Sequence, residues 1–383
     1  MNMNNKNWVS VWGNAVSIAE HHPEAYAKYI TLRYPVYIPF DGDTLRFTFD
    51  NFCGSEAVTV TRATVSAATS PVYEKMPLAC PCKKETICDI TFSKNESVTM
   101  EAHQTAVSDP VSFPVKKGMT LTVSLYFADF TLMQSAVLVT GPLSKGFFSL
   151  GDQTHADALP MDTTKTTNWF YFLSNIELMT AEENHTVICY GDSITAGAWP
   201  DYLTLLARQN PDNHTAFIRR ATSGSRVLRQ YECITYDSYG LKGTNRFPHE
   251  IPTTGADTVI IQQGINDIIH PIGIETNPFR PMSDLPTAKE LIDGYRYYIE
   301  EAKKLHLKVY MGTLLPIFGW RTYATFRDDL RNELNAWIRS AKEIDGCIDF
   351  DLALRGSENP SAFREGFDSG DHLHPSSKAY QAM

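Results

Sequence analysis

The sequence lacks the features that mark membrane proteins and nucleic-acid-binding proteins. It carries a formal net charge of −10 over 383 residues and has no run of Lys and Arg. Binding to phosphate groups needs a concentrated basic face, so we expect neither a nucleic-acid nor an anionic membrane partner. No uninterrupted apolar run is long enough to cross a bilayer. The N-terminus also lacks a basic flank followed by an apolar stretch, which predicts a cytoplasmic protein without a signal peptide.

Cysteine is also scarce. The chain has seven cysteines, and an odd number spread over so long a chain does not indicate a disulfide framework. Only Cys80, Cys82 and Cys88 lie close together in the sequence. A metal or redox site is one interpretation of this group, but its spacing matches no common zinc pattern, so free thiols in a loop are favoured. We expect no metal ion and no other cofactor.

Two parts of the chain differ in the period of their apolar residues. Up to about residue 180, apolar and polar residues alternate, as in residues 45–50, 58–61 and 120–125. This period is typical of half-buried antiparallel strands and predicts a jelly-roll-like β-sandwich, an accessory domain over residues 1–180. In residues 184–383 short apolar runs alternate with helical patterns, which predicts an α/β domain with a parallel sheet covered on both faces. The chain length also favours two domains.

The second part offers five candidate strands and two clear candidate helices. Thr287 and Glu290 have the spacing of a capping box. Apolar stripes over residues 291–305 and 326–341 predict two helices that face the core. Active sites in sheets of this kind gather at the C-terminal ends of the strands. The candidate strands occupy residues 187–190, 217–218, 258–262, 309–314 and 347–350.

Ser193 follows the first of these strands, in the string Gly191-Asp192-Ser193-Ile194-Thr195. A serine there could act as a nucleophile, but Gly-Asp-Ser is also a common turn that caps a helix, and alone the turn is the better interpretation. The Gly-x-Ser-x-Gly elbow of α/β-hydrolases is absent. Gly224 lies in a Ser-Gly-Ser turn, where its backbone N–H could face a small oxyanion. A plain loop glycine explains that turn equally well.

Asn266 follows Gly264 after the third candidate strand. A side-chain amide at this place can donate to a developing oxyanion, and one such donor contributes roughly 3 kcal/mol to lowering the barrier. The alternative is a turn asparagine. For Asp267 beside it, a role as a brace or a cap is favoured over a role in the reaction.

Asp371 and His374 lie near the C-terminus, and Pro375 comes next. The proline predicts a helix that starts here, with His374 at its entrance. One turn of chain lets the Asp371 carboxylate accept from Nδ1–H of His374, which leaves Nε2 free to take a serine proton. His372 is a weaker candidate for the base, since it is too close to Asp371 in sequence for the same bond. Metal ligation by this string is disfavoured, because no second ligand cluster lies near Ser193.

These four blocks together, in this order, resemble the SGNH or GDSL-type hydrolase family, whose letters correspond to Ser193, Gly224, Asn266 and His374. The resemblance covers the second half of the chain and implies a flavodoxin-like three-layer α/β/α domain with a five-stranded parallel sheet. It also implies that Ser193 attacks an ester carbonyl and that His374, oriented by Asp371, moves the proton. The N–H groups of Ser193 and Gly224 and the amide of Asn266 would then hold the oxyanion, without metal or cofactor.

Four strings of the first half also match a known pattern, and they are Thr31-Leu32-Arg33, Arg46 through Gly54, Ser108-Asp109-Pro110-Val111 and Trp169 through Ser174. Through them the first half resembles, more loosely, the β-sandwich that precedes the catalytic domain in one bacterial subgroup of that family.

The second half departs from the family at one place. It has Arg219-Arg220-Ala221 in place of the usual Asn-Ala-Gly before the second block, which could change how that loop is braced.

The favoured hypothesis is a serine esterase that removes short acyl groups, acetyl first among them, from a small-molecule or oligosaccharide ester. The carbohydrate part rests on analogy with two-domain carbohydrate acetylesterases. A lipase, thioesterase or aryl esterase and an acyltransferase remain alternatives, and a non-enzymatic sugar-binding protein is the least favoured. The sequence leaves the oligomeric state open. Four aromatic residues near strand ends could stack on sugar rings or simply pack in the core: Trp199, Phe279, Phe318 and Trp320.

Overall fold

The computed structural model describes residues 6–19 and 25–383. Residues 1–5 lie outside the described residues. The prediction that the protein lacks a signal peptide rests partly on them. Contacts divide the chain into two units, Met1–Thr186 with Leu203–Arg219 and Val187–Tyr202 with Arg220–Met383. The domain boundary placed between residues 180 and 184 stays a prediction.

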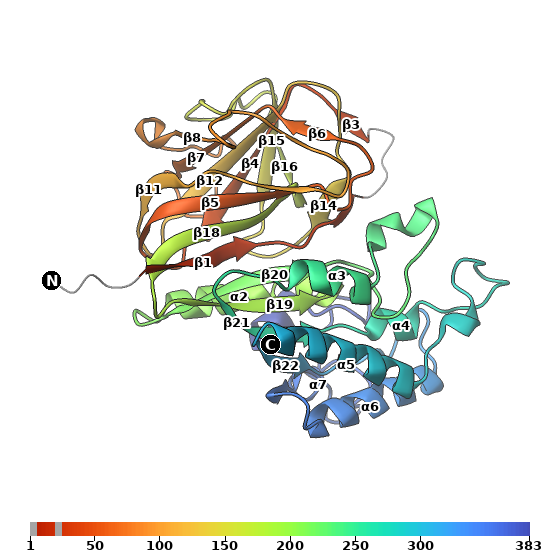
Figure 1. The fold of residues 1–383 in the computed structure, drawn as a ribbon. Coiled ribbons are helices and arrows are strands. Elements are labelled where there is room, and N and C mark those ends of the chain that lie inside the picture. Colours follow the sequence, from red (N-terminus) through yellow and green to blue (C-terminus); the bar gives the residue numbers. More distant parts are fainter. Residues whose placement is uncertain (1–5, 20–24) are drawn as a thin grey trace. The chain divides into compact units, whose positions relative to one another are not determined.

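The first unit is built from antiparallel strands (Figure 1). One sheet has the order β1-β18-β5-β10 with β11 also paired to β5, and a second has the order β16-β15-β4-β12-β7-β8. Short sheets pair β13 with β3, β6 with β9, and β17 and β2 with β14. The first sheet contains β1 (Lys6–Gly13), β5 (Gly42–Asp50), β10 (Thr105–Val107), β11 (Val111–Val115) and β18 (Leu173–Ala181). The second contains β4 (Ile30–Tyr37), β7 (Arg62–Ala67), β8 (Cys88–Ile90), β12 (Thr120–Phe127), β15 (Gly146–Leu150) and β16 (Lys165–Thr167). The short strands are β2 (Ser17–Ile18), β3 (Tyr26–Ala27), β6 (Val58–Val60), β9 (Val98–Met100), β13 (Thr131–Leu132), β14 (Ser135–Leu138) and β17 (Trp169–Tyr171).

Strand β12 shows where alternation misleads. Its apolar residues alternate with Thr and Ser as predicted, yet all eight of its residues are buried. The hydroxyl of Ser124 accepts from Nε of Arg33 at 2.9 Å, and Arg33 also donates to the carbonyls of Gln153 and Ala156. The polar face is therefore covered by a loop that supplies hydrogen bonds, so the prediction of a half-buried strand is wrong for β12.

The second part of the chain carries a sheet of order β20-β19-β21-β22-β23, in which β21, β22 and β23 run parallel. The order reverses between β19 and β21, and open α/β sheets bind ligands outside the carboxyl ends of strands at such a point. All five candidate strands are present, each longer or shifted by a few residues. They are β19 (His185–Gly191), β20 (Thr215–Ala221), β21 (Ala256–Gln262), β22 (Lys308–Gly312) and β23 (Gly346–Ile348).

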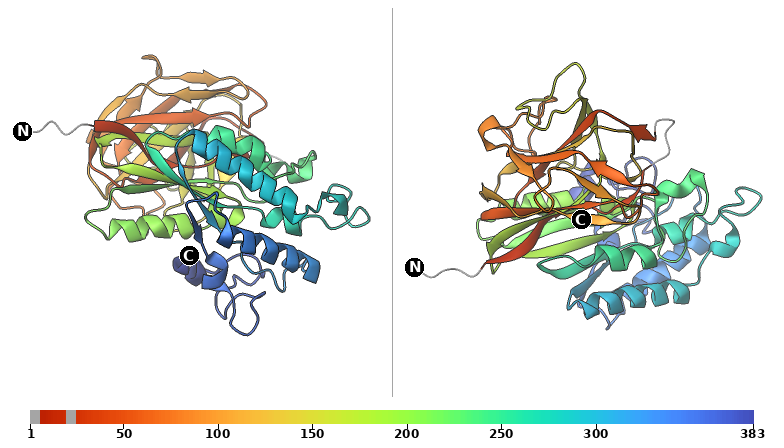
Figure 2. Two further views of the ribbon diagram at one scale, coloured as in Figure 1. Left: turned by 60° about the horizontal axis from the view of Figure 1, so that its bottom comes forward. Right: turned by 45° about the horizontal axis from the view of Figure 1, so that its top comes forward.

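Helices flank this sheet, and the predicted fold class is confirmed (Figure 2). Helices α3, α5 and α6 pack side by side, while α7 packs with α8. Trp199 at the start of α2 lies against Phe350 at the start of α7, with ring centroids 5.6 Å apart. The helices are α1 (Ser193–Ala196), α2 (Trp199–Arg208), α3 (Gly243–Glu250), α4 (Ile265–Ile269), α5 (Ala288–Lys304), α6 (Thr325–Ser340), α7 (Phe350–Leu354) and α8 (Ser377–Ala382). Three short 3-10 helices are η1 (Lys84–Thr86), η2 (Ile234–Tyr239) and η3 (Met282–Asp284).

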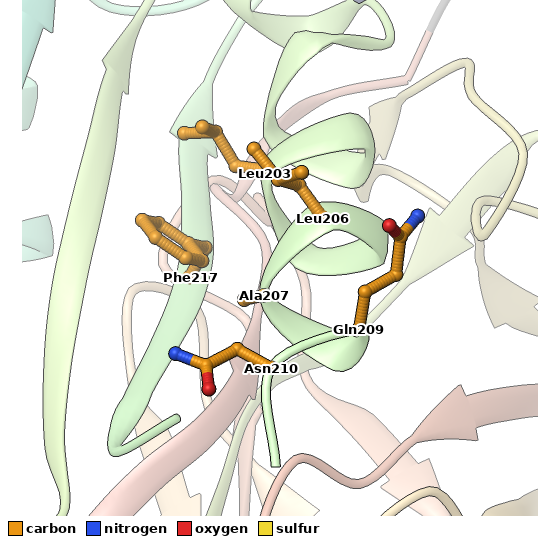
Figure 3. Close-up of a pocket in the computed structure, with 6 residues that line it drawn as sticks. All are labelled: Leu203, Leu206, Ala207, Gln209, Asn210 and Phe217. Atoms are coloured by element: carbon orange, nitrogen blue, oxygen red, sulfur yellow. The ribbon is translucent and has the colours of Figure 1, made fainter. Parts of the chain in front are cut away.

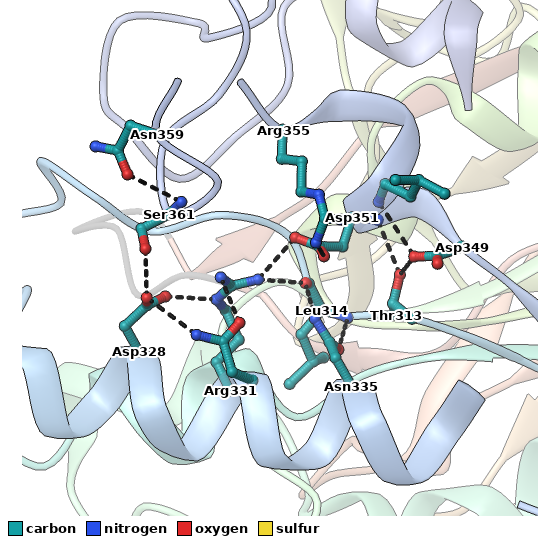
Figure 4. Close-up of polar contacts among 12 residues, drawn as sticks. Thr313, Leu314, Asp328, Arg331, Asn335, Asp349, Asp351, Arg355, Asn359 and Ser361 are labelled. Carbon is teal, nitrogen blue, oxygen red and sulfur yellow. Dashed lines mark hydrogen bonds and ion pairs between the residues drawn. The ribbon is translucent and has the colours of Figure 1, made fainter. Parts of the chain in front are cut away.

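The two helices predicted from apolar stripes differ in how well their stripes are buried. Helix α5 begins at the capping box that Thr287 and Glu290 form, as predicted. On α6, by contrast, Phe326 is 48% exposed while Arg331 is 1% exposed. Arg331 donates to Asp328 of its own helix and to Asp351 of α7 (Figure 4). The α6 stripe is therefore only partly core, because a buried ion-pair network takes up much of the inner face.

An apolar hollow of about 390 Å³ lies between α2 and β20 (Figure 3). None of its lining residues belongs to the four blocks. Among the described residues, no helix combines the length and apolar character that crossing a membrane would require. The hollow is lined by Leu203, Leu206, Ala207, Gln209, Asn210 and Phe217.

Candidate active site

Ser193, His374 and Asp371 form one hydrogen-bonded chain. Oγ of Ser193 lies 2.8 Å from Nε2 of His374, and Nδ1 of His374 lies 2.6 Å from Oδ2 of Asp371. Because a carboxylate can only accept here, Nδ1 carries the proton and Nε2 is left to accept from the serine hydroxyl. Ser193 is the first residue of α1, and only the cap residue Asp192 separates it from the end of β19. The fold thus brings together three residues that the sequence places in two distant blocks.

The loop that holds His374 differs from the prediction. Helix α8 starts after the cap residue Ser376, whose hydroxyl accepts from the N–H of Ala379. Pro375 therefore precedes the helix, and His374 does not lie at its entrance. His374 is instead held by Asp371, whose Oδ1 accepts from the backbone N–H of His374 at 2.9 Å. The serine cap takes the place that the prediction gave to proline, since its side chain satisfies an otherwise unpaired N–H.

His372, the competing candidate for the base, has a partner of its own. Its Nδ1 lies 2.5 Å from Oδ2 of Asp368, and its side chain is 52% exposed. No hydrogen bond joins it to Ser193 among the described residues. The geometry therefore favours His374 over His372.

Gly224 follows β20 in a conformation that requires glycine. Its φ is +78°, and a Cβ at this position would lie 2.1 Å from Cδ1 of Tyr239. A side chain would therefore clash with a ring as well as strain the backbone. Within the described part of the chain, the backbone N–H groups of Ser193 and Gly224 have no hydrogen-bond partner. Both are available as donors.

Asn266 and Asp267 lie at the start of α4 and connect to the loop of Gly224. Nδ2 of Asn266 donates to the carbonyl of Ser225 at 3.1 Å, and this bond uses one of its two hydrogens. The Asp267 carboxylate accepts from the backbone N–H groups of Val227 at 2.7 Å and Leu228 at 3.0 Å. This geometry agrees with the interpretation of Asp267 as a brace.

Arg246 of α3 is a supporting residue that the sequence analysis missed. It is 1% exposed and pairs with Glu250 at 2.6 Å. Its Nη2 donates to the carbonyl of Gly191 at 2.9 Å, and its Nη1 contacts the carbonyl of Arg220 at 3.4 Å. Arg246 thus ties the ends of the two strands that lead to Ser193 and Gly224. The only sequence signal was an Arg and a Glu four residues apart, which is common on exposed helices.

Burial sets the protonation of the carboxyl groups around the site. Burial raises the pKa of Asp192 to about 7, and the neighbouring charge of Asp267 adds to the shift. Burial likewise raises the pKa of Asp267 to about 6, against the hydrogen bonds from Val227 and Leu228. In Asp371 burial is outweighed by hydrogen bonds from His374 and from two backbone amides, which lower its pKa to about 2. Asp371 therefore stays ionised and keeps His374 oriented throughout the range in which enzymes work.

The four aromatic residues considered for stacking on sugar rings differ in burial. Trp199 is 1% exposed and packs on Phe350, so the stacking hypothesis is wrong for this residue. Phe279 and Phe318 are 53% and 47% exposed. A Cβ on Gly319 would lie 2.8 Å from the ring of His372, so the loop that carries Phe318 and Trp320 borders the loop of His374.

All seven cysteines are free thiols. Cys80 and Cys82 are buried, and burial raises the pKa of Cys80 to about 12. A thiol with so high a pKa is a poor nucleophile and a poor metal ligand at neutral pH. No group of three or more His, Cys, Asp or Glu side chains among the described residues is arranged to hold a metal ion.

The family model for the GDSL-like lipase/acylhydrolase family matches residues 189–382, just over half of the chain. The chain belongs to this family. Its members are hydrolases that act on esters, and this assigns the acylhydrolase described here to the same broad class. A search of curated proteins finds no match.

Several solved structures resemble this acylhydrolase. One is a putative acylhydrolase from Bacteroides fragilis, with 22% identity over 52% of this chain and 82% of that chain, at a TM-score of 0.37. A GDSL-like lipase from Bacteroides thetaiotaomicron has 21% identity over 53% of this chain and 84% of that chain, at a TM-score of 0.38. An acetyl xylan esterase from Geobacillus stearothermophilus has 17% identity over 52% of this chain and 92% of that chain, at a TM-score of 0.39.

Proposed function

We propose that this acylhydrolase is a serine esterase that hydrolyses short-chain acyl esters, acetyl first among them, on a carbohydrate alcohol. The observation that carries the proposal is the hydrogen-bonded chain from Ser193 through His374 to Asp371. A hydroxyl paired with an oriented imidazole is what nucleophilic acyl transfer requires. The carbohydrate alcohol rests on the resemblance of the two-part layout to carbohydrate acetylesterases.

In the proposed mechanism the Ser193 hydroxyl attacks the ester carbonyl while Nε2 of His374 takes its proton. The oxyanion that forms is held by the free N–H groups of Ser193 and Gly224 and by the second amide hydrogen of Asn266. His374 then gives its proton to the leaving alcohol. Water, deprotonated by the same imidazole, releases the acyl group from Ser193. Asp371 stabilises the imidazolium at each stage and remains ionised itself.

The preference for a short acyl group rests on the same analogy with carbohydrate acetylesterases. A long acyl chain would need an extended apolar groove that leads from the nucleophile. The apolar hollow of Figure 3 is lined by none of the residues of the four blocks.

Hydrolysis of nitrophenyl esters of increasing chain length tests the acyl preference. We expect kcat/KM to be highest for acetate and to fall as the chain lengthens. Activity that rose toward long chains would instead assign a lipase or thioesterase. Product analysis with added sugar alcohols separates hydrolysis from acyl transfer, since a transferase would yield acetylated sugar in place of free acetate.

Substitution of the triad tests the mechanism. Ser193→Ala and His374→Ala should each lower kcat by several orders of magnitude, and the double variant should be little worse than either, because the residues act as a unit. His372→Ala is the matched control, since that imidazole pairs with Asp368 outside the chain of hydrogen bonds. Unchanged ester hydrolysis in purified Ser193→Ala protein would rule out this site.

A further inference from the structure

A group of buried and half-buried side chains that the proposed chemistry does not use lies beside Gly224. Tyr239, whose ring contacts Gly224, stacks on His270 with ring centroids 5.2 Å apart. Tyr231 lies 5.6 Å from the same tyrosine ring and 5.9 Å from His270. These side chains therefore lie next to Gly224, one of the proposed oxyanion donors. We call the group the Arg–Tyr cluster, and it consists of Arg226, Tyr231, Tyr236, Tyr239, His270 and Arg280.

Arg280 is the unusual member of the Arg–Tyr cluster. It is only 6% exposed, yet no carboxylate of the described residues lies within ion-pairing distance of its guanidinium. Its Nε is buried without a hydrogen-bond partner, and its guanidinium lies 5.6 Å from the ring centroid of Tyr236. Buried charges in proteins are normally paired. Arg280 interacts with the Tyr231 hydroxyl but has no carboxylate among the described residues, so the partner that it lacks is an anion.

The surroundings of Arg280 are also positively charged. Arg226 is 2% exposed and forms an ion pair with Asp284 at 3.1 Å. Arg327 donates to the backbone carbonyls of Ile268 and Pro271, which satisfy its hydrogens without neutralising it. Arg226 also acts electrostatically on the carboxylate of Asp267. Asp284 and Asp267 thus supply two negative charges for the guanidinium groups of Arg280, Arg226 and Arg327. The excess charge favours an anion.

One further polar group of the cluster lacks a hydrogen bond within the described part of the chain, and this is the buried Nδ1 of His270. The buried hydroxyl of Tyr231 interacts with the Arg280 guanidinium. Burial and then the charges of Arg280, Arg226 and Arg321 hold the pKa of His270 well below its usual range, so the imidazole is neutral. The Tyr231 ring lies 4.2 Å from the Arg226 guanidinium. A buried imidazole nitrogen without a hydrogen bond and a buried guanidinium without a carboxylate thus occur together.

We propose that the Arg–Tyr cluster binds the carboxylate of an acidic sugar, so that the substrate is an acyl ester of a uronic acid. The inference rests on the proposed esterase function and adds a substrate class to it. A guanidinium presents parallel N–H donors that match a carboxylate, and the Tyr231 hydroxyl supplies a further donor. A site whose buried donors require an anion also discriminates against the neutral sugar, which would leave those donors unpaired.

Binding to a protein that cannot turn over its substrate provides the first test. Ser193→Ala protein is titrated calorimetrically with acetylated methyl glucuronoside and with acetylated methyl glucoside. We expect the uronate to bind at least roughly tenfold more tightly, as suits a charge-assisted contact that the neutral ligand lacks. Adding Arg280→Met should remove that preference, and adding Arg280→Lys should retain part of it. Arg296→Gln on the exposed face of α5 is the matched arginine control and should keep the preference.

Thermal unfolding separates a ligand-binding arginine from a structural one. Replacing an unpaired buried cation by an apolar side chain of similar length should leave the Tm of the free protein unchanged or raise it. A structural arginine would instead lower the Tm when removed. The acetylated glucuronoside should raise the Tm of Ser193→Ala and should not raise that of the double variant with Arg280→Met.

The outcomes distinguish this inference from the proposed function. Equal affinity of Ser193→Ala for the two ligands overturns the uronate inference, whether or not Arg280→Met folds. Hydrolysis of both acetylated sugars with equal kcat/KM by the native protein overturns it too and leaves the esterase function standing. Tight uronate binding without hydrolysis of any ester supports the cluster as a carboxylate site and overturns the esterase function.

Discussion

Single polar contacts determine the geometry of the candidate active site. Ser193 and His374 are 181 positions apart in the sequence and 2.8 Å apart in space, joined by one hydrogen bond. Asn266 reaches the loop of Gly224 through one hydrogen of its amide and keeps the other free. Asn266 therefore has one amide hydrogen in a contact with the fold and one available for the oxyanion, so its substitution must be followed both by kinetics and by the free energy of unfolding.

Asn266→Ala should lower kcat about 10²- to 10³-fold with a smaller effect on KM, because the amide is proposed to bind the oxyanion and not the ground-state ester. Steady-state kinetics with nitrophenyl acetate measure both constants. A change in KM alone would mean that Asn266 binds substrate, and the oxyanion role would be wrong. The unfolding free energy serves as the control, since Asn266 also bonds to the Ser225 carbonyl.

Asp192 predicts a pH dependence of stability. Its pKa is raised to about 7 in the folded protein, so the folded state keeps a proton that the unfolded state releases near pH 4. The contribution of the protonated Asp192 to the free energy of unfolding is fully present below pH 4. It is lost as the pH rises to about 7, because ionisation favours the unfolded state. Asp192→Asn should reduce the loss of stability between pH 4 and pH 7 by on the order of 4 kcal/mol. Urea unfolding across that range measures it, and identical slopes for both proteins would contradict the prediction.

Elements are held in place by buried ion pairs as well as by apolar packing. Asp351 of α7 is 1% exposed and accepts from Arg331 and Arg355 (Figure 4). It also accepts from Arg339. Arg331 also pairs with Asp328, which accepts from the Ser361 hydroxyl. The carbonyl of Ser361 in turn accepts from the N–H groups of residues 317 and 318, at the start of the loop that borders His372. The network therefore connects two helices to a loop at the edge of the site.

Asp351→Asn should destabilise the protein by about 3–5 kcal/mol, since it leaves buried guanidinium groups without their carboxylate. Asp293→Asn on α5 is the matched control. Asp293 is 45% exposed and pairs only with exposed side chains, so its loss should cost less than about 1 kcal/mol. Urea unfolding of both variants provides the comparison. Equal effects would mean that the network is stabilised mainly by packing.

At the scale of the whole molecule, the chain does not divide at a single point. Residues 203–219 cluster with the first unit. Within that unit Nζ of Lys117 donates to the carbonyls of Pro211 at 2.7 Å and Asn210 at 3.0 Å, and the guanidinium of Arg208 lies 3.8 Å from the ring centroid of Tyr73. A chain that began at residue 184 would lose all of these contacts.

A fragment of residues 184–383 should therefore unfold at a Tm roughly 5 °C or more below that of the full chain, or fail to fold. Differential scanning calorimetry measures the difference. Lys117→Ala in the full chain is the control, because it removes one cationic side chain and should have a much smaller effect. A fragment as stable as the full chain would support the simple boundary predicted between residues 180 and 184.

Local patterns predicted much of the architecture. The capping box at Thr287, the five short apolar runs and the alternation in the first half gave the right elements, because each reflects the chain's own geometry over a few residues. The polar face of β12 and the inner face of α6 were not predictable in this way. The burial of Ser124 and Arg331 depends on partners more than 15 positions away in the sequence. The spacing of apolar residues within one element carries no information about such partners.

The sequence by itself determined the family, the positions of the sheet's five strands in the sequence and the residue types of the candidate triad. These follow from short motifs that adjacent residues define. Only the tertiary structure decided that His374 and not His372 bonds to Ser193, that Trp199 is core, and that Arg280 is buried without a carboxylate. The physical reason is that burial and pairing depend on which distant side chains share one volume, and that is set by the fold.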